Sequence, residues 1–197
     1  MAAANYDELQ AEAARWAGGS SDSNFPQIVR DAISFAEIDL DHTLWVPERI
    51  KRVVADFKAE YEALPDDCSK LISIKRIEDG EEREPLRKQH LDVMPGLACT
   101  YSGRKPMFYA LAGAQVQFAP KPTTDTPLRA RWIYYGMVPR LSDVTSCTAV
   151  LTTYPQVYLY TVLKHLAPFA DDAKGAAKWG ALSDQAILAA NRAAVIR

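Results

Sequence analysis

The side chains that most often carry chemistry are scattered along this chain. A zinc site usually contains ligand pairs that lie about two to four residues apart. No such pair occurs among the three histidines and three cysteines, which are His42, His90, His165, Cys68, Cys99 and Cys147. We therefore expect buried thiols, histidines at or near the surface, and neither a metal nor a cofactor.

Two pairs of adjacent carboxylates, Asp66-Asp67 and Asp171-Asp172, suggest acid–base chemistry. Such groups act as general acid and base only when a cleft partly removes them from water. Both pairs lie at expected boundaries of helices or loops, where aspartate caps backbone N–H groups, and we interpret them as caps. The chain also lacks a nucleophile elbow, a phosphate-binding loop and a dinucleotide fingerprint. We expect no enzyme activity, and a hydrolase without a recognisable motif ranks last among the hypotheses.

A basic and aromatic cluster is the third candidate. Arg129 and Arg131 precede Trp132, and Tyr135 and Arg140 follow. Arginines and aromatic rings on one strand face can bind single-stranded nucleic acid, because bases stack on the rings and phosphates pair with the cations. The chain has a net charge of −2, whereas proteins that grip phosphates are usually basic. A nucleic-acid-binding module that uses Arg129, Arg131 and Trp132 therefore stays an alternative function.

Three expected strands surround this cluster. The first covers residues 107–112 and the second covers residues 115–120, and Gly113 between them can take the positive φ of a tight turn. The third covers residues 128–135, where apolar and charged side chains alternate: Leu128, Ala130, Trp132 and Tyr134 on one face, Arg129, Arg131, Ile133 and Tyr135 on the other. This alternation predicts one buried and one exposed face. We expect the three strands to form an antiparallel meander.

A hairpin is expected before the meander. Residues 71–77 have a β pattern, and Asp79-Gly80 is the strongest hairpin signal in the chain because both residue types tolerate positive φ. Residues 84–88 would form the return strand. The many charges around the turn predict a solvated tip.

Helical periodicity flanks the strands on both sides. Apolar residues recur at the spacing of an amphipathic helix in six stretches, 3–17, 24–40, 46–61, 144–151, 155–168 and 171–197. In the stretch 46–61 periodicity favours helix, although the β-branched Val53 and Val54 also fit an extended segment. Asn24 is expected to cap the second helix, and Asp41-His42-Thr43 is expected to break it.

This order predicts an α+β fold, in which a helical bundle carries an inserted antiparallel β lobe made of a hairpin and a meander. We expect an N-terminal helix and flexible linker over residues 1–23, a helical bundle over 24–70 and 142–197, and the β lobe over 71–141. The first helix would pack on its own chain or on a neighbouring copy. No apolar stretch reaches the roughly 20 residues that cross a membrane, and the odd, widely spaced cysteines favour synthesis in a reducing cytosol.

A set of short motifs occurs in a fixed order along residues 24–180. The motifs are Asn24-Phe-Pro-Gln-Ile-Val-Arg-Asp-Ala32, Leu64-Pro-Asp-Asp67, Tyr109 with Gly113 and Val116–Pro122, Trp132–Tyr135, Val138–Asp143, Tyr154–Tyr160 and Trp179. As an ordered set they resemble the head-to-tail adaptor (connector) proteins of tailed bacteriophages and related particles.

The resemblance implies a structural protein of the virion neck, made in the host cytoplasm. Such adaptors form a ring, commonly twelve-fold, beneath the portal protein and above tail or neck proteins. The ring joins the capsid to the tail, and double-stranded DNA passes through it without specific binding. The resemblance implies no cofactor and no membrane partner, and it implies that the C-terminal segment docks onto the portal.

The end of the chain supplies the candidate portal contact. Residues 185–197 combine alanine with large apolar side chains and contain neither glycine nor proline, which favours a helix. Free chain ends are usually polar and frayed, so we expect this end to have a partner, either its own bundle or another protein. Given the resemblance, the portal-binding residues would be Ile187, Leu188, Arg192, Val195, Ile196 and Arg197, with the arginines pairing with acidic portal residues.

Overall fold

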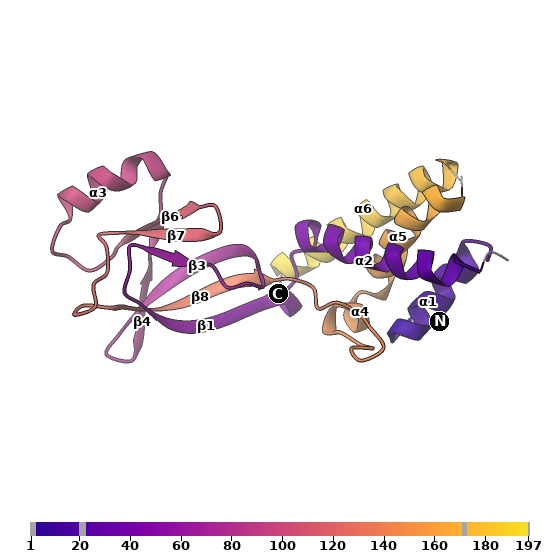
Figure 1. Ribbon diagram of the computed structural model, residues 1–197, viewed down its shortest axis with the longest axis horizontal. Helices are drawn as coiled ribbons and strands as arrows, with labels where there is room; N and C mark the ends of the chain where they lie inside the picture. The colour runs from indigo at the N-terminus through magenta and orange to yellow at the C-terminus, as the bar shows by residue number, and fades with distance from the viewer. Residues whose placement is uncertain (1–2, 20–22, 171–172, 197) are drawn as a thin grey trace. The chain divides into compact units, whose positions relative to one another are not determined.

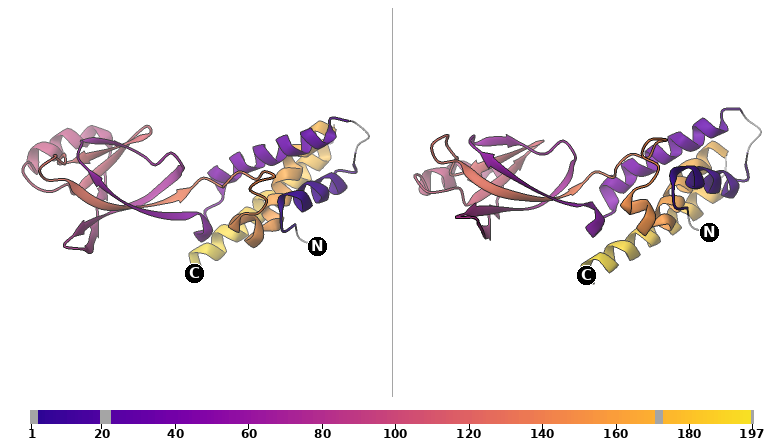
Figure 2. Two further views of the ribbon diagram at one scale, coloured as in Figure 1. Left: turned by 60° about the horizontal axis from the view of Figure 1, so that its bottom comes forward. Right: turned by 90° about the horizontal axis from the view of Figure 1, so that it is seen from below.

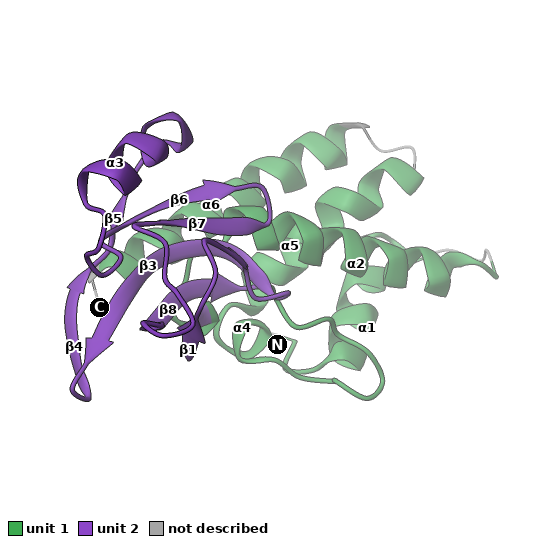
Figure 3. Ribbon diagram, turned by 60° about the vertical axis from the view of Figure 1, so that its left-hand side comes forward, with its two compact units in different colours: residues 1–49, 137–197 green, residues 50–136 purple. Residues whose placement is uncertain are grey.

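The computed structural model describes residues 3–19, 23–170 and 173–196 (Figure 1). The chain divides into two compact units (Figure 3). The helical unit comprises residues 1–49 and 137–197, and the β unit comprises residues 50–136. The α+β class and the insertion of β structure between helical segments agree with the prediction. The chain passes between the units at 49/50 and 136/137, not at the expected positions 70/71 and 141/142.

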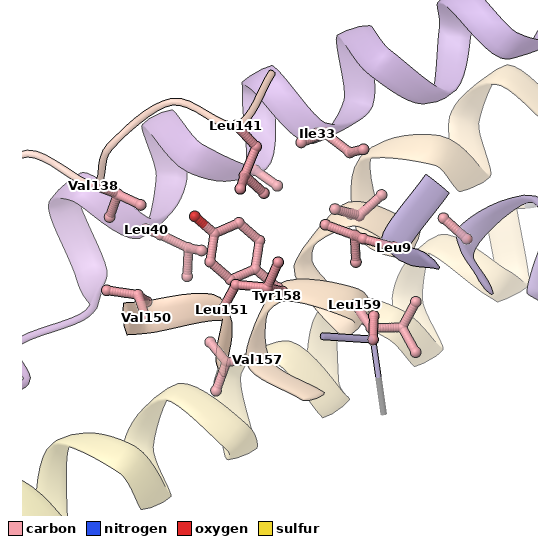
Figure 4. Packing of buried hydrophobic residues seen from close by; sticks show 14 of the residues in the cluster. Leu9, Ile33, Leu40, Val138, Leu141, Val150, Leu151, Val157, Tyr158 and Leu159 are labelled. Carbon is pink, nitrogen blue, oxygen red and sulfur yellow. The ribbon is translucent and has the colours of Figure 1, made fainter. Parts of the chain in front are cut away.

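The helical unit is built around α5 (Pro155–Leu166), which packs against α1, α2 and α6 (Figures 1 and 2). The other elements are α1 (Tyr6–Trp16), α2 (Phe25–Thr43), η1 (Pro47–Arg49), α4 (Ala149–Thr153), η3 (Ala167–Ala170) and α6 (Ala173–Ile196). Apolar stripes at helical spacing meet in one core. In that core, shown in Figure 4, the ring of Tyr158 is surrounded by Leu40, Val138, Leu141 and Leu151.

The first helix packs on its own chain. The side chain of Asn5 accepts a hydrogen bond from the Glu8 N–H at 2.9 Å, and the Glu8 carboxylate accepts one from the Ala4 N–H at 2.8 Å. This reciprocal capping fixes the start of α1. Leu9 and Ala13 on its inner face are fully buried. The flexible linker expected over residues 18–23 falls partly on residues 20–22, which lie outside the described part of the chain.

Two expectations for the helical segments are wrong. Asn24 has a helical backbone and its side chain does not cap α2. The predicted break at Asp41-His42-Thr43 is also wrong, because α2 continues to Thr43. The helix end is stabilised by Arg49, whose guanidinium donates to the carbonyl oxygens of Leu40 at 2.7 Å and Asp41 at 3.1 Å.

The expected helix over 144–151 is shifted. It is observed as α4, Ala149–Thr153, where the Thr148 hydroxyl accepts a hydrogen bond from the Leu151 N–H at 3.1 Å. A threonine that caps a helix lies just before its first turn. The cap therefore places the start of α4 after Thr148, and Val144 is left 96% exposed in the preceding loop.

The β unit contains two four-stranded sheets. The first has the order β1 (Ile50–Phe57), β8 (Leu128–Gly136), β3 (Cys68–Glu78) and β4 (Glu81–Pro85), with every neighbouring pair antiparallel. The second has the order β2 (Tyr61–Ala63), β7 (Gln115–Ala119), β6 (Phe108–Ala112) and β5 (Arg87–Lys88), where β5 and β6 are parallel. The short elements η2 (Leu91–Val93) and α3 (Met94–Thr100) follow β5, and α3 packs on β6 and β7.

The strand β1 corrects the helix favoured for residues 46–61. Its residues pair with β8 along their whole length, with Val53 opposite Trp132. The residues of this segment have only a weak intrinsic preference between helix and strand. The neighbouring strand β8 decides the structure, because it hydrogen-bonds to the backbone N–H and C=O groups of β1.

The strand β8 corrects the expected meander. The hairpin of β6 and β7 is confirmed, with a φ of 63° at Gly113. However, β8 does not continue that sheet, because it pairs with β1 and β3 in the other one. Alternation along β8 is confirmed, since every second side chain from Leu128 is buried.

The hairpin at Asp79-Gly80 is confirmed. Both residues have positive φ, 53° and 83°, as a type I′ turn requires. The return strand β4 begins at Glu81, earlier than the expected residue 84. Inner faces of the two sheets share one core, in which the ring centroid of Phe57 lies 5.4 Å from that of Phe118 and 5.2 Å from that of Trp132.

Candidate functional site

Three buried ionisable side chains form a polar junction in the helical unit, at the point where the chain leaves this unit and returns to it. Glu37, Asp41 and Arg49 are 1%, 5% and 3% exposed. The half-exposed Arg140 completes the junction. Buried charges cost free energy unless they are paired and hydrogen-bonded, so their contacts show what holds this region together.

Asp41 is the centre of the junction. Its Oδ1 accepts a hydrogen bond from the Val138 N–H at 2.6 Å, and its Oδ2 accepts one from Arg140 at 2.7 Å. Arg49 Nη2 lies 3.5 Å from Oδ1. Because Arg49 also caps the end of α2, one carboxylate links the departing chain, the returning chain and the helix.

Glu37 lies one turn before Asp41 and holds the next part of the returning chain. Its Oε1 accepts a hydrogen bond from the Leu141 N–H at 2.7 Å, and its Oε2 lies 3.9 Å from Arg140 Nη1. Burial raises the pKa of Glu37 to about 7, although the Leu141 hydrogen bond and the Arg140 charge pull it down. The junction therefore positions backbone and carries one carboxyl that exchanges a proton near neutral pH. This junction was not predicted, although the sequence contains a signal for it: Glu37 and Asp41 follow Ile33 at four-residue intervals on the buried stripe of α2.

The C-terminal helix α6 is anchored by two polar contacts. The hydroxyls of Thr161 in α5 and Ser183 in α6 lie 2.8 Å apart and are fully buried. Nearer the chain end, Asn191 donates to the Thr43 carbonyl at 2.9 Å and accepts from the Trp45 N–H at 2.7 Å. The last turns of α6 are thus fixed to the end of α2.

The structure divides the predicted portal-binding residues into two groups. Ile187 is 8% exposed and packs in the core of its own unit. Leu188, Arg192 and Val195 are exposed, with 49% exposure for Leu188 and 87% for Val195. Their spacing of four and three residues places them on one side of the helix. The side chain of Ile196 and the whole of Arg197 lie outside the described part of the chain.

A groove of about 400 Å³ lies beside α6. The segment from α4 to the start of α5 forms one wall, and small side chains of α6 form the other, so that the lining consists of Thr153, Tyr154, Pro155, Gln156, Val157, Ala186, Ala189 and Ala190. Ala189 borders Leu188 in sequence. The groove faces Ala186, Ala189 and Ala190, whereas Leu188, Arg192 and Val195 project from a different side of α6.

The proposed basic-aromatic face is not formed. Trp132 is 2% exposed and lies in the core of the β unit. Arg129 and Arg131 point to the opposite side of β8, as the burial alternation shows. Arg131 pairs with Glu82, and Arg129 lies 4.0 Å from Asp56. A base therefore has no tryptophan on which to stack, and the cations are partly neutralised.

The carboxylate pairs and the histidines have other contacts. Asp66-Asp67 precedes β3 and caps no helix; instead Asp67 accepts hydrogen bonds from Lys51 at 2.5 Å and from the Tyr134 hydroxyl at 3.0 Å. Asp171-Asp172 lies outside the described residues. His165 Nε2 lies 3.2 Å from Asp39. Within ranges 3–19, 23–170 and 173–196, no three His, Cys, Asp or Glu side chains gather as a metal site would require.

These contacts fix α6 to α5 and to the end of α2, and they leave Leu188 and Val195 of α6 exposed. The family model for the SU10 adaptor protein matches residues 4–196. The chain belongs to this family. The match spans both the helical unit and the β unit, and it confirms the predicted resemblance to phage head-to-tail adaptor proteins. The family consists of structural proteins of phage virions.

No curated protein matches the chain. Among the described residues, no helix is both long enough and apolar enough to cross a membrane.

Proposed function

We propose that this adaptor protein forms a ring beneath the portal of the phage head, twelve-fold as the resemblance implies. The ring joins the capsid to the tail and encloses part of the DNA passage. Its role is structural and not catalytic. Family membership across residues 4–196 carries the proposal. The exposed Leu188 and Val195 side chains of α6 support it, because neighbouring large apolar groups left in solvent can mark a contact with another protein.

The side of α6 with Leu188, Arg192 and Val195 is the proposed portal contact. Asn191 anchors the same turns to the Thr43 carbonyl and the Trp45 N–H. The helix is therefore already ordered before docking, and binding costs little conformational entropy. Full burial of one leucine or valine side chain contributes roughly 1.5–3 kcal/mol. Arg192 adds a cation that can pair with an acidic portal residue. Ile187 packs in the core of the adaptor itself. We propose that Ile196 and Arg197 extend the portal contact beyond Val195.

DNA is expected to pass through the ring without a specific site. The alternative, a nucleic-acid-binding module, loses its main support because Trp132 is buried. We expect weak DNA binding at low salt and none at physiological salt, whereas a dedicated module would bind with a steep salt dependence.

The test is assembly with the portal protein of the same phage. Purified alone, the adaptor should be a monomer or a weak oligomer, and with the portal it should form rings visible by electron microscopy and native mass spectrometry. The double variant Leu188→Ser/Val195→Ser should keep the thermal melting temperature and bind the portal at least tenfold more weakly. Ile38→Ser is the matched control, because Ile38 on α2 is 48% exposed, close to the 49% of Leu188.

Deletion of residues 195–197 separates docking from folding. The shortened chain should fold, by circular dichroism, and dock poorly. A deletion variant that assembles like the full chain would contradict docking through this tail. Failure of the unaltered protein to join the portal at any salt concentration would reject the adaptor function itself.

A further inference from the structure

The two edges of the larger sheet in the β unit carry opposite charge. In the order β1, β8, β3, β4, the strands β1 and β4 are the outer ones. Edge strands present unpaired backbone groups and are natural sites for contact with another chain. On the β1 edge, Val53 and Val54 are each 42% exposed, so apolar surface is available beside those groups.

The β4 edge is acidic. Its five residues, Glu81–Pro85, are all exposed and comprise three glutamates, one arginine and a proline. Glu78 and Asp79 at the hairpin end add two more carboxylates. Some of this charge is already paired, since Glu78 contacts Arg76 and Lys105 and Glu81 lies 3.3 Å from Arg83. Glu84 makes no ion pair within the β unit, all of which the structure describes.

The β1 edge is basic at its beginning. Lys51 and Arg52 are exposed there, and Lys51 pairs with Asp67 at 2.5 Å. Arg52 makes no ion pair within the β unit. A free cation and a free carboxylate, Arg52 and Glu84, thus occupy opposite edges of one sheet.

We propose that the β4 edge of one copy docks on the β1 edge of the next copy, with Glu81 and Glu84 facing Arg52. This contact would join neighbouring β units in the ring, and it rests on the proposed function. Such an interface is heterologous, because two different patches meet, and heterologous contacts form a ring when the rotation from copy to copy closes. Contact between two β4 edges would instead bring glutamates together and is disfavoured.

Strand direction is compatible with this arrangement. Three successive antiparallel pairings make β4 run opposite to β1. Rotation about an axis along the strands keeps strand directions, so a neighbour's β4 would meet β1 in the antiparallel sense. The register shift between β3 and β4 and the missing N–H of Pro85 make β4 a poor template for a continuous hydrogen-bonded ladder. Side-chain charge therefore carries the contact.

The experiment uses charge reversal on each edge and then a mixture. Arg52→Glu makes both edges acidic, and Glu81→Lys/Glu84→Lys makes both edges basic. The portal is mixed with fewer adaptor copies than it can bind, and native mass spectrometry counts the copies on each portal. The distribution of these counts shows whether adaptor copies bind cooperatively. The unaltered protein should give mostly full and empty portals at low salt, whereas each variant alone should give partly filled ones, with neighbour association weakened about tenfold. An equal mixture of the two variants should restore full rings, because copies can alternate.

Matched controls change the same charges elsewhere on the β unit. Lys121→Glu and Asp92→Lys/Asp125→Lys should leave the filling pattern unchanged, and thermal melting checks that all variants fold. If both edge variants fill portals as cooperatively as the unaltered protein, or if the mixture restores nothing, the edge contact is overturned. Random filling by the unaltered protein would overturn the edge contact while leaving portal docking intact. Failure of the unaltered protein to bind the portal would overturn both proposals.

Discussion

Glu37→Gln should make the protein more stable at alkaline pH and should remove part of the pH dependence of its stability. The pKa of Glu37 is raised from 4.5 to about 7, first by burial and then by the charge of Asp41, against the Leu141 hydrogen bond and Arg140. Glutamine has no proton to lose, yet it keeps an oxygen that can accept the Leu141 N–H. The variant thus changes the titration and preserves the backbone contact.

The sign follows from proton binding. Below pH 4.5 the carboxyl is protonated in both states, and the stability contribution is fully present. Between pH 4.5 and about 7 the unfolded chain loses the proton while the folded chain keeps it, so the free energy of unfolding falls as pH rises. The displacement from 4.5 to about 7 corresponds to a total loss of roughly 3 kcal/mol.

The assay is urea unfolding from pH 4 to pH 8.5 for the unaltered protein, Glu37→Gln and a control, Asp143→Asn, which changes an exposed carboxyl. The difference in unfolding free energy between Glu37→Gln and the unaltered protein should grow by roughly 3 kcal/mol across the window. The carboxyls with lowered pKa, such as Asp39 and Asp67, affect both proteins equally and cancel. A difference that stays constant with pH would refute the reasoning that Glu37 keeps its proton in the fold.

Three further substitutions test other parts of the structure. Asn191→Ala should cost about 1–3 kcal/mol in urea unfolding, because the Thr43 carbonyl and the Trp45 N–H lose their partner; an unchanged midpoint would show that the α6 anchor is unimportant. Gly80→Val should cost about 1–2 kcal/mol and reduce hydrogen-exchange protection in the hairpin, because φ at this position is 83°; full protection would show that the turn tolerates a side chain. Trp132→Ala should cost about 3–5 kcal/mol through the cavity it leaves, and fluorescence titration should show the same weak binding of single-stranded DNA as before; a selective loss of DNA binding would revive the nucleic-acid interpretation.

Local chemistry was sufficient for some elements. At Asp79-Gly80 both residues tolerate positive φ, so the turn type could be predicted from two neighbouring residues and is confirmed. The amphipathic stripes of α5 and α6 could also be predicted, because helical spacing of apolar side chains depends only on the chain itself. The ordered motifs likewise led to the adaptor family, which the match over residues 4–196 confirms.

Long-range pairing decided what local chemistry left open. The segment Ile50–Phe57 fits a helix or a strand, and only the partner β8, more than 70 residues away in sequence, makes it a strand. For the same reason β8 is not part of the expected meander: it pairs with β1 and β3 and not with the hairpin of β6 and β7. The neighbours of a strand depend on which backbone edges the rest of the fold leaves free.

Burial was the other quantity that only the tertiary structure could supply. Ile187 and Leu188 are adjacent and equally apolar, yet one packs in the core and the other is half exposed, because successive residues of a helix point about 100° apart. Glu37 and Asp41 continue the apolar stripe of α2 in sequence, but they find partners only where Val138 and Leu141 return to α2 and offer their N–H groups. A carboxylate is tolerated in the interior when such partners replace water, and residues that are about 100 positions apart can meet only after the chain has folded.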